Sequence, residues 1–309
     1  MKKLLALTAL AISGIFPAFA QQSEQNHAER FEQLGTMLRT PNVYRTASGA
    51  PGHMYWQQQA NYVINVELDD ANQSIKGSEK VTYINNSPDQ LTYLWVQLEE
   101  NQRGADSDTP KAAESSIDSR MTLRTLEGLI WANDDFGYKV LEVKDAKGNP
   151  LPVTVNKTMM RIDLPTPLKA GASFTFGVDW TFNITNRVGY ISGRPGYEYF
   201  EGDDNYLYTM AEWFPRMAVY SDFEGWQNKQ FMGSGEFALV FGNYEVNITV
   251  PSDHMVGATG ELQNASQVLS ATELNRWNTA KKTYDAPVVI RTQDEATELE
   301  KGKATTKKT

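Results

Sequence analysis

Apolar and polar residues alternate along most of this chain from about residue 55 onward. In residues 62–68, tyrosine, isoleucine, valine and leucine occupy every second position, which predicts a strand with one buried face. Similar patterns predict further strands at residues 75–85, 91–98, 138–143, 160–164 and 173–182. Turn-forming clusters separate these strands, so we expect an all-β fold, a large antiparallel β-sandwich or curved sheet, over residues 55–292.

The two ends of the chain lack this alternation. Residues 21–54 begin with Ala28, Phe31 and Leu34 at helical spacing, which predicts one short amphipathic helix followed by an irregular arm. Residues 293–309 are charged and alanine-containing at first, then small and polar. We expect a helix or linker there, ending in a polar C-terminal tail that leads toward a missing domain.

The first twenty residues have the three parts of a secretory signal peptide. Two lysines precede the apolar run Leu4–Ile15, and Ala18-Phe19-Ala20 places small residues where signal peptidase cleaves. The alternative is an uncleaved N-terminal anchor. No later segment approaches the length needed to span a membrane. We therefore expect a periplasmic or extracellular protein without membrane contact after cleavage.

Composition excludes several functions. The chain has no cysteine, which removes disulfides, thiol catalysis and cysteine metal sites from consideration. Its formal net charge is −9, and removal of the two lysines of the signal makes it −11. An acidic surface repels phosphate backbones, so we expect no nucleic-acid partner. The basic stretch at residues 301–308 is interpreted as a solvated tail.

A search for catalytic motifs finds none. The three histidines, His27, His53 and His254, lie in unrelated contexts, and no H-E-x-x-H pair is present. Nucleophile elbows and nucleotide-binding glycine loops are also absent from the sequence. The acidic pairs Asp203-Asp204 and Glu198 with Glu201 match no calcium loop and are interpreted as solvated. We therefore predict no catalytic residue and no metal ligand in this chain.

The most aromatic region runs from Gly189 to Trp226. It is compatible with an aromatic core, or with a substrate-facing wall in which rigid rings surround a few polar groups. Glu212 stands within it between Ala211 and Trp213. Because an acid among apolar residues is costly to bury unpaired, we expect Glu212 either to pair with Arg216 or to bind a cationic ligand.

Two segments of the chain resemble a known family. The first runs from Gly196 to Met217 and continues with Gly225-Trp-Gln-Asn-Lys; the second is G-E-F-A-L-V-F-G-N-Y-E-V-N-I-T-V-P-S-D-H-M-V-G-A-T-G-E-L, Gly235 to Leu262. Together they resemble the N-terminal domain of bacterial secreted members of the aminopeptidase N family of zinc metallopeptidases, which are gluzincins. In this resemblance, residues 283–289 look like the strand that closes the domain.

The resemblance implies a saddle-shaped all-β domain that packs against a thermolysin-like catalytic domain. That domain would supply the zinc, the only cofactor expected, and this sequence ends before the family's zinc helix. In the family an acidic or amide side chain ahead of an arginine helps to hold the free amino terminus of the peptide substrate. Glu212 ahead of Arg216 is the match here, and its role would be orientation of the substrate rather than bond breaking.

Two alternatives remain open at the level of sequence. The chain is expected to be inactive alone, as the substrate-cleft domain of a zinc aminopeptidase without its catalytic domain. It could instead be a non-catalytic protein- or peptide-binding β module that is derived from the same fold. A carbohydrate-binding β-sandwich would require aromatic rings in a line on an exposed face, which sequence order does not reveal.

Overall fold

The computed structural model describes residues 41–109, 120–123, 135–187, 194–202, 204–233, 235–300 and 304–309. The chain divides into two compact units, Met1–Tyr55 and Trp56–Thr309. In the first unit, a turn is closed by a bridge between Arg45 and Pro51, and the Arg45 guanidinium lies 5.0 Å from the centre of the Tyr55 ring. The predicted signal peptide and N-terminal helix lie outside the described residues.

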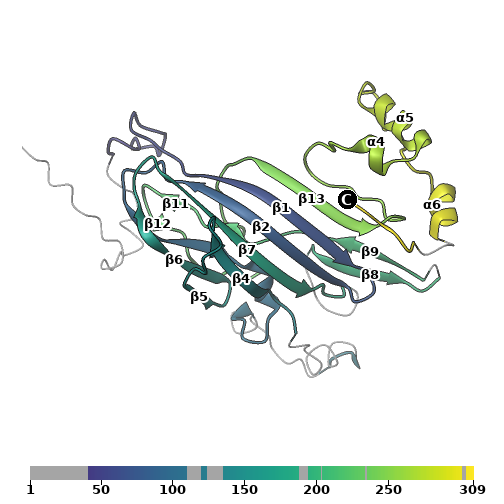
Figure 1. Cartoon of the computed structure of the whole chain (residues 1–309), viewed down its shortest axis with the longest axis horizontal. Coiled ribbons are helices and arrows are strands. Elements are labelled where there is room, and N and C mark those ends of the chain that lie inside the picture. Colours follow the sequence, from purple (N-terminus) through teal and green to yellow (C-terminus); the bar gives the residue numbers. More distant parts are fainter. Residues whose placement is uncertain are drawn as a thin grey trace, which may run out of the picture. The chain divides into compact units, whose positions relative to one another are not determined.

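The second unit is a β-sandwich, which confirms the predicted all-β fold class. A six-stranded sheet has the order β14-β13-β1-β2-β7-β4, and a four-stranded sheet has the order β10-β3-β6-β5 (Figure 1). The strands of the two sheets are β1 (Gln59–Asp69), β2 (Ser74–Ile84), β3 (Leu91–Gln97), β4 (Lys139–Asp145), β5 (Val153–Asn156), β6 (Met159–Leu168), β7 (Ser173–Asn183), β10 (Arg216–Met217), β13 (Tyr244–Pro251) and β14 (Lys307–Lys308).

Shorter elements connect these strands. The hairpins are β8 (Gly196–Phe200) with β9 (Asn205–Thr209), and β11 (Tyr220–Ser221) with β12 (Gly225–Trp226). A 3-10 helix, η3 (Glu99–Arg103), follows β3 directly.

Alternation of side chains along the long strands builds the core. In β1 and β2 every second residue is buried, and the apolar ones among them share one cluster with Leu94, Val96 and Ile162 of the opposite sheet. Gly77 of β2 lies beneath the Trp180 indole. A Cβ atom at residue 77 would lie 2.2 Å from a ring carbon of Trp180, so this position requires glycine.

One pairing differs from the predicted antiparallel sheet. β13 lies parallel to β1, with Tyr62 opposite Tyr244 and Glu67 opposite Thr249, and Figure 1 shows the two strands side by side. A parallel pair needs a long connection between its strands. Here that connection contains the whole second sheet, and a pattern of local turns could not reveal it.

The segment after β13 is helical, not β. It contains α4 (Ala265–Val268), α5 (Ala271–Ala280) and α6 (Gln293–Glu300), of which only a helix near α6 was predicted. Residues 283–289 form no strand, so the expected closing strand is wrong there; the chain returns to the sheet as β14. None of the helices in the described ranges is long and apolar enough to cross a membrane.

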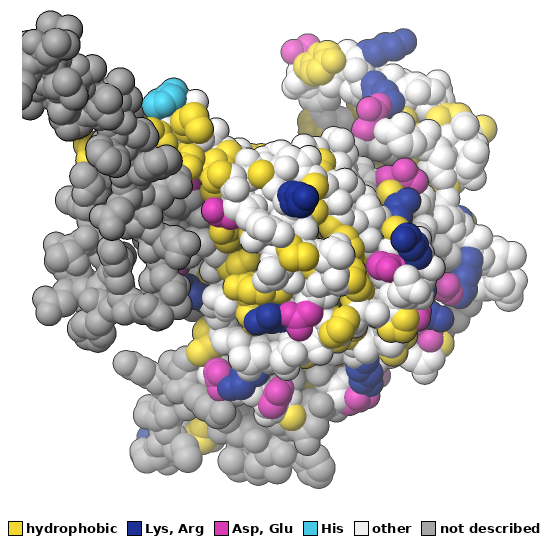
Figure 2. Space-filling view, turned by 60° about the vertical axis from the view of Figure 1, so that its left-hand side comes forward, with side chains coloured by type: hydrophobic (Ala, Val, Ile, Leu, Met, Phe, Trp, Pro, Cys, Tyr) yellow, Lys and Arg dark blue, Asp and Glu magenta, His cyan; other side chains and the backbone are white. Residues whose placement is uncertain are grey.

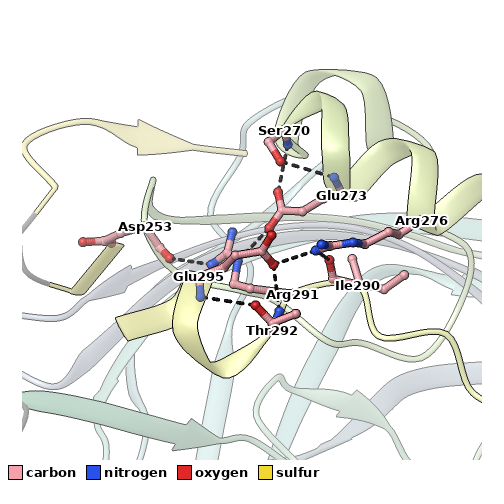
Figure 3. A network of polar contacts seen from close by, with 8 residues as sticks. All are labelled: Asp253, Ser270, Glu273, Arg276, Ile290, Arg291, Thr292 and Glu295. Carbon is pink, nitrogen blue, oxygen red and sulfur yellow. Dashed lines mark hydrogen bonds and ion pairs between the residues drawn. The ribbon is translucent and has the colours of Figure 1, made fainter. Parts of the chain in front are cut away.

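A polar network holds this helical segment together (Figure 3). The Ser270 side chain accepts a hydrogen bond from the Glu273 backbone, and the Glu273 carboxylate accepts one from the Ser270 backbone at 2.8 Å. This is the reciprocal capping box that starts α5. Arg291 adds an ion pair to Glu273 at 2.6 Å and donates to the Asp253 carbonyl at 3.1 Å. The network therefore ties α5 to the end of β13.

α6 begins with the same type of capping box. The Thr292 backbone donates to the Glu295 carboxylate at 2.9 Å, and the Glu295 backbone donates to the Thr292 hydroxyl at 3.3 Å. Arg276 of α5 pairs with Glu295 at 2.6 Å and donates to the Ile290 carbonyl at 3.0 Å. Hydrogen bonds from Arg276 and the Thr292 backbone lower the pKa of Glu295 to about 2. Each helix start is therefore joined to the other helix or to the sheet.

Candidate functional site

Glu212 lies in the loop between β9 and β10, and its surroundings hold it in one position. Its backbone is left-handed, with φ at +56°, and its carbonyl accepts a 2.9 Å hydrogen bond from the buried Tyr138 hydroxyl. The next two residues pack inward: Trp213 lies 6.3 Å from Trp180 and Phe214 lies 5.8 Å from Tyr62, between ring centres. The left-handed turn is therefore held by contacts of the Glu212 carbonyl and of the two residues that follow it.

The Glu212 carboxylate is 10% exposed and already binds a cation. Its partner is Arg194, at 2.8 Å, and the same Arg194 nitrogen lies 2.5 Å from Glu236. Arg194 and Glu236 are both mostly exposed. One arginine thus bridges a nearly buried carboxylate and a solvent-exposed one, and the group carries an excess of one negative charge.

The predicted pair between Glu212 and Arg216 is wrong. Arg216 belongs to β10 and lies opposite Gln97 of β3, which places its guanidinium against Glu99, immediately after that strand. Glu99 and Arg216 form a buried ion pair, with side chains 3% and 15% exposed. The strand register therefore directs Arg216 to Glu99, while the left-handed turn directs Glu212 to Arg194.

A second buried acid, Glu100, lies close to Glu212. It pairs with Arg103 at 2.8 Å within η3, and one of its carboxylate oxygens has no hydrogen-bond partner among the described residues. Burial raises the pKa of the Glu100 carboxyl to about 7; the Arg103 charge opposes this shift, and the Glu212 charge adds to it. Glu100 therefore changes its charge near neutral pH, next to the Glu212 carboxylate.

A third acid lies inside the sandwich. Glu79 of β2 is 4% exposed, and neither of its carboxylate oxygens has a partner among the described residues. Burial raises its pKa well above the usual value, because burial disfavours the charged carboxylate. After burial itself, the charges of Glu100, Glu79 and Glu212 are the main causes that raise the pKa of Tyr138. Each of the three acids therefore interacts electrostatically with the Tyr138 hydroxyl.

The arrangement is suited to binding a cation. The side chains of Glu212 and Glu100 combine low exposure with interacting charges, and a carboxylate attracts positive charge. Within the described ranges, no group of three histidine, aspartate or glutamate side chains is placed to hold a metal ion.

The other residues singled out in the sequence have structural surroundings. His254 lies 3.0 Å from Asp253 and is stacked on the Tyr208 ring, whereas His27 lies outside the described residues. Glu198 pairs with Arg187 at 3.3 Å, and Asp204 accepts a 2.9 Å hydrogen bond from Tyr199.

Sequence reasoning missed Glu79, Glu100 and Arg194. Glu79 could have been found, because it occupies the core-facing register of an alternating strand, where an acid is unexpected. Glu100 and Arg194 carry no such signal. Glu100 follows the end of β3, and Arg194 precedes the β8–β9 hairpin. Both lie in segments whose composition is that of any solvated loop.

Comparison with known proteins gives a structural likeness only. No protein-family model matches the sequence, and no curated protein matches it. Among solved structures, the M1 zinc metallopeptidase from Deinococcus radiodurans is similar at 11% identity and a TM-score of 0.36, over 69% of this chain and 37% of that chain. A mutant of it bound to a Tyr-Ser-Ala substrate is similar at 12% identity and a TM-score of 0.34, over 70% of this chain and 38% of that chain. A two-domain M1 zinc metallopeptidase mutant bound to L-arginine is similar at 13% identity and a TM-score of 0.34, over 67% of this chain and 35% of that chain. This chain therefore spans little more than a third of the length of those peptidases.

Proposed function

We propose that this chain forms the non-catalytic β region of an exported, zinc aminopeptidase-like metallopeptidase and shapes its substrate cleft. The sequence motifs between Gly196 and Leu262, which occur in the same order as in that family, support this assignment. The low exposure of the Glu212 carboxylate and its ion pair with Arg194 also support it. A thermolysin-like catalytic domain would be the partner and would supply the zinc. Peptides would be the substrate, and the signal-like residues 1–20 support a periplasmic or extracellular location.

In this proposal Glu212 holds the free amino terminus of the peptide. The observation that carries it is the ion pair with Arg194: a carboxylate that is 10% exposed, anchored by core aromatics, already binds a cation at 2.8 Å. A peptide ammonium has the same charge and can replace the exposed Arg194 guanidinium. An acetylated amino terminus is neutral and leaves the carboxylate without compensation, so the site discriminates in favour of free amino ends.

Binding of matched peptides tests this role. A dipeptide amide with a free amino terminus is titrated into the chain and compared with its N-acetylated form by NMR or calorimetry. Glu212→Gln should weaken binding of the free amine by about 10- to 100-fold, because a hydrogen bond to a charged group contributes about 1.5–3 kcal/mol. Glu236→Gln is the matched control: it removes the same charge from the exposed side of Arg194 and should change binding far less.

Reconstitution with a separately produced catalytic domain tests the larger assignment. Addition of this chain should restore hydrolysis of amino-acyl anilides, and the Glu212→Gln chain should restore less at limiting substrate. Binding of the free amine without any restored hydrolysis would favour the alternative, a non-catalytic peptide-binding module. The half-exposed Tyr199, Phe200 and Leu207 of the β8–β9 hairpin are the feature that favours this second candidate.

A further inference from the structure

A pocket of about 460 Å³ lies where the β1–β2 turn, the end of β7 and the β8–β9 hairpin meet, and its volume is that of a small-molecule site. Four of its seven lining residues carry amide side chains: Asn72, Gln73, Asn183 and Asn186. Two more, Phe136 and Tyr197, are aromatic. None of these seven described residues is charged, whereas acidic and basic groups are dispersed among the apolar patches of the surface in Figure 2. The lining therefore suits a neutral ligand that forms hydrogen bonds.

The turn between β1 and β2 holds two of the amides in place. The Asn72 amide nitrogen donates to the Asp69 carboxylate at 2.8 Å, and the Gln73 amide nitrogen donates to the Asp70 carbonyl at 2.5 Å. Gln73 has a left-handed backbone, with φ at +47°, and its carbonyl accepts a 2.8 Å hydrogen bond from the Ile184 backbone. The turn is therefore tied to the segment after β7, which lines the same pocket.

Asn183, the last residue of β7, is oriented in a similar way. Its amide nitrogen donates to the Asp135 carboxylate at 2.8 Å and to the Asp135 carbonyl at 3.1 Å. In Asn72 and Asn183 the side-chain hydrogen bonds to described residues all use the nitrogen, which leaves each amide oxygen as an acceptor at the pocket. An amide presents an acceptor and a donor side by side, so it can bind two adjacent hydroxyl groups, each of which both donates and accepts.

Aromatic rings continue from the pocket along the β8–β9 hairpin. The register pairs Tyr197 with Tyr208 and Tyr199 with Tyr206, and alternation along each strand puts these four residues on one face, the tyrosine face. The Tyr206 ring centre lies 5.7 Å from that of Tyr197 and 4.9 Å from that of Tyr199. The Tyr208 hydroxyl donates to Asp70 at 2.6 Å, which ties this face to the β1–β2 turn. Neighbouring rings therefore extend from Tyr197 in the pocket to Tyr199, which is 43% exposed.

A sugar ring matches both parts of this surface. Its hydroxyl groups project from the edge of the ring, whereas its two faces present apolar C–H groups. Stacking such a face on a tyrosine ring removes apolar surface of both from water, and the amides replace the hydrogen bonds that the hydroxyl groups lose with water. Charge sets a further limit. Asp69, Asp70 and Asp135 are bonded to the amides, so an anionic sugar is repelled.

We propose that the amide pocket and the tyrosine face bind a neutral oligosaccharide, with one sugar unit in the pocket and the next on the rings of Tyr206 and Tyr199. This arrangement supplies the neighbouring aromatic rings on an exposed face that a carbohydrate-binding β-sandwich requires. None of the lining residues belongs to the Glu212 site, so the proposal goes beyond the function proposed above.

NMR of the isotopically labelled chain tests the proposal. The probes are neutral tetrasaccharides of glucose, mannose and N-acetylglucosamine, and tetragalacturonate is their anionic counterpart. At least one neutral probe should cause saturable shifts of the side-chain amide signals of Asn72 and Asn183 and of the Tyr199 ring signals. Tetragalacturonate should cause none at the same concentration, because the acids around the pocket repel it. Glu212→Gln should leave saccharide binding unchanged, which separates this site from the amino-terminus site.

The two faces of the hairpin provide a matched pair of variants. Tyr199 and Leu207 are 43% and 49% exposed, and Leu207 follows Tyr206 directly, so it lies on the face opposite the tyrosines. Tyr199→Ala should weaken tetrasaccharide binding about tenfold, because a stacked ring is lost, and Leu207→Ala should leave it unchanged. Tyr199→Phe keeps the ring and should retain binding, although it loses the hydrogen bond to Asp204.

Asn183→Ala tests the pocket itself. It should weaken binding of both a monosaccharide and the tetrasaccharide about tenfold, because hydrogen bonds to the hydroxyl groups are lost. Tyr199→Ala, in contrast, should affect only the tetrasaccharide, since the monosaccharide occupies the pocket alone. Urea unfolding checks that the Asn183 variant is folded, and the Tyr199 variants decide the question if it is not.

Three outcomes would overturn the proposal. They are the absence of saturable shifts with every neutral saccharide at millimolar concentration, saturable shifts that avoid the pocket and the hairpin, and equal losses of binding in Tyr199→Ala and Leu207→Ala. A dipeptide amide that shifts the Asn72 and Asn183 signals when no saccharide does would assign the pocket to peptides instead.

Discussion

Two regions of this molecule are organised by arginine–glutamate pairs, and they differ in how completely their polar atoms are satisfied. In the helical segment, Glu273 and Glu295 each accept bonds both from an arginine and from a helix-start backbone N–H (Figure 3). In the region around Glu212, both carboxylate oxygens of Glu79 and one of Glu100 make no hydrogen bond to any described residue, and neither does the side chain of Gln97.

The pKa values follow this difference. Burial alone would raise the pKa of Glu273, but hydrogen bonds from Arg291 and Ser270 outweigh it and lower the pKa. At Glu100 burial dominates over the Arg103 pair, and the pKa rises to about 7. A satisfied network stabilises the charged form and has a structural role. An unsatisfied one lowers stability, and such clusters mark candidate binding sites.

The largest effect is expected from Arg216→Met. This change leaves Glu99 buried without its partner, and breaking a buried ion pair on one side costs about 3–5 kcal/mol. Urea unfolding measures the free energy of unfolding. The double variant Glu99→Gln with Arg216→Met should recover most of the loss, because no buried charge is left unpaired. A loss of equal size in the double variant would contradict this explanation.

An intermediate effect is expected from Glu100→Gln, and it depends on pH. The ordinary carboxyl pKa is 4.5 and burial raises that of Glu100 to about 7. Below pH 4.5 both folded and unfolded states hold this proton; as pH rises toward 7, the unfolded state has lost it while the folded state retains it. Stability therefore falls with rising pH over this window, by about 3 kcal/mol for the full shift. Glu100→Gln should remove this contribution, so the variant loses less stability between pH 4.5 and 7 than the parent chain. A parallel pH profile for the two chains would show that Glu100 does not titrate there.

The smallest effect on stability is expected in the helical segment, where the polar network is fully hydrogen-bonded. Ser270→Ala removes the side chain that accepts from the Glu273 backbone at 3.3 Å, and loss of such a cap costs about 1 kcal/mol. Faster amide hydrogen exchange in α5 measures it. Ser270→Asp retains an acceptor at the cap and should exchange like the parent chain. Unchanged exchange in the alanine variant would mean that Arg291 alone holds this helix start.

The sequence predicted the long strands because their alternation is local, and the register of β1 with β2 follows from a short turn. It could not predict that β13 lies parallel to β1, since that pairing joins segments separated by an entire sheet. The missed α5 did have a signal: Ser270 followed by Glu273 is a capping-box pattern. The alternation of the preceding strands was extended over it instead.

For the candidate site, the sequence singled out Glu212 and offered Arg216 or a cationic ligand as its partner, whereas the structure pairs it with Arg194. A spacing of four residues suggested Arg216, whereas the positive φ of Glu212 and the β10–β3 pairing send the two side chains in different directions. Backbone conformation at a single residue cannot be read from composition. Arg194 lies 18 residues away in sequence and meets Glu212 only through the fold.

The parallel pairing of β1 with β13 also has a kinetic consequence. Asn65 and Asn247, which are hydrogen-bonded across this pair, are 182 residues apart in the chain, whereas β1 and β2 are joined by a short turn. Contacts between distant segments form late, because the loop must close before they are gained. β1 and β2 should therefore pair first and leave the outer edge of β1 exposed until β13 arrives. Until then β1 presents a template on which another unfolded chain can pair, so refolding yield should fall as protein concentration rises.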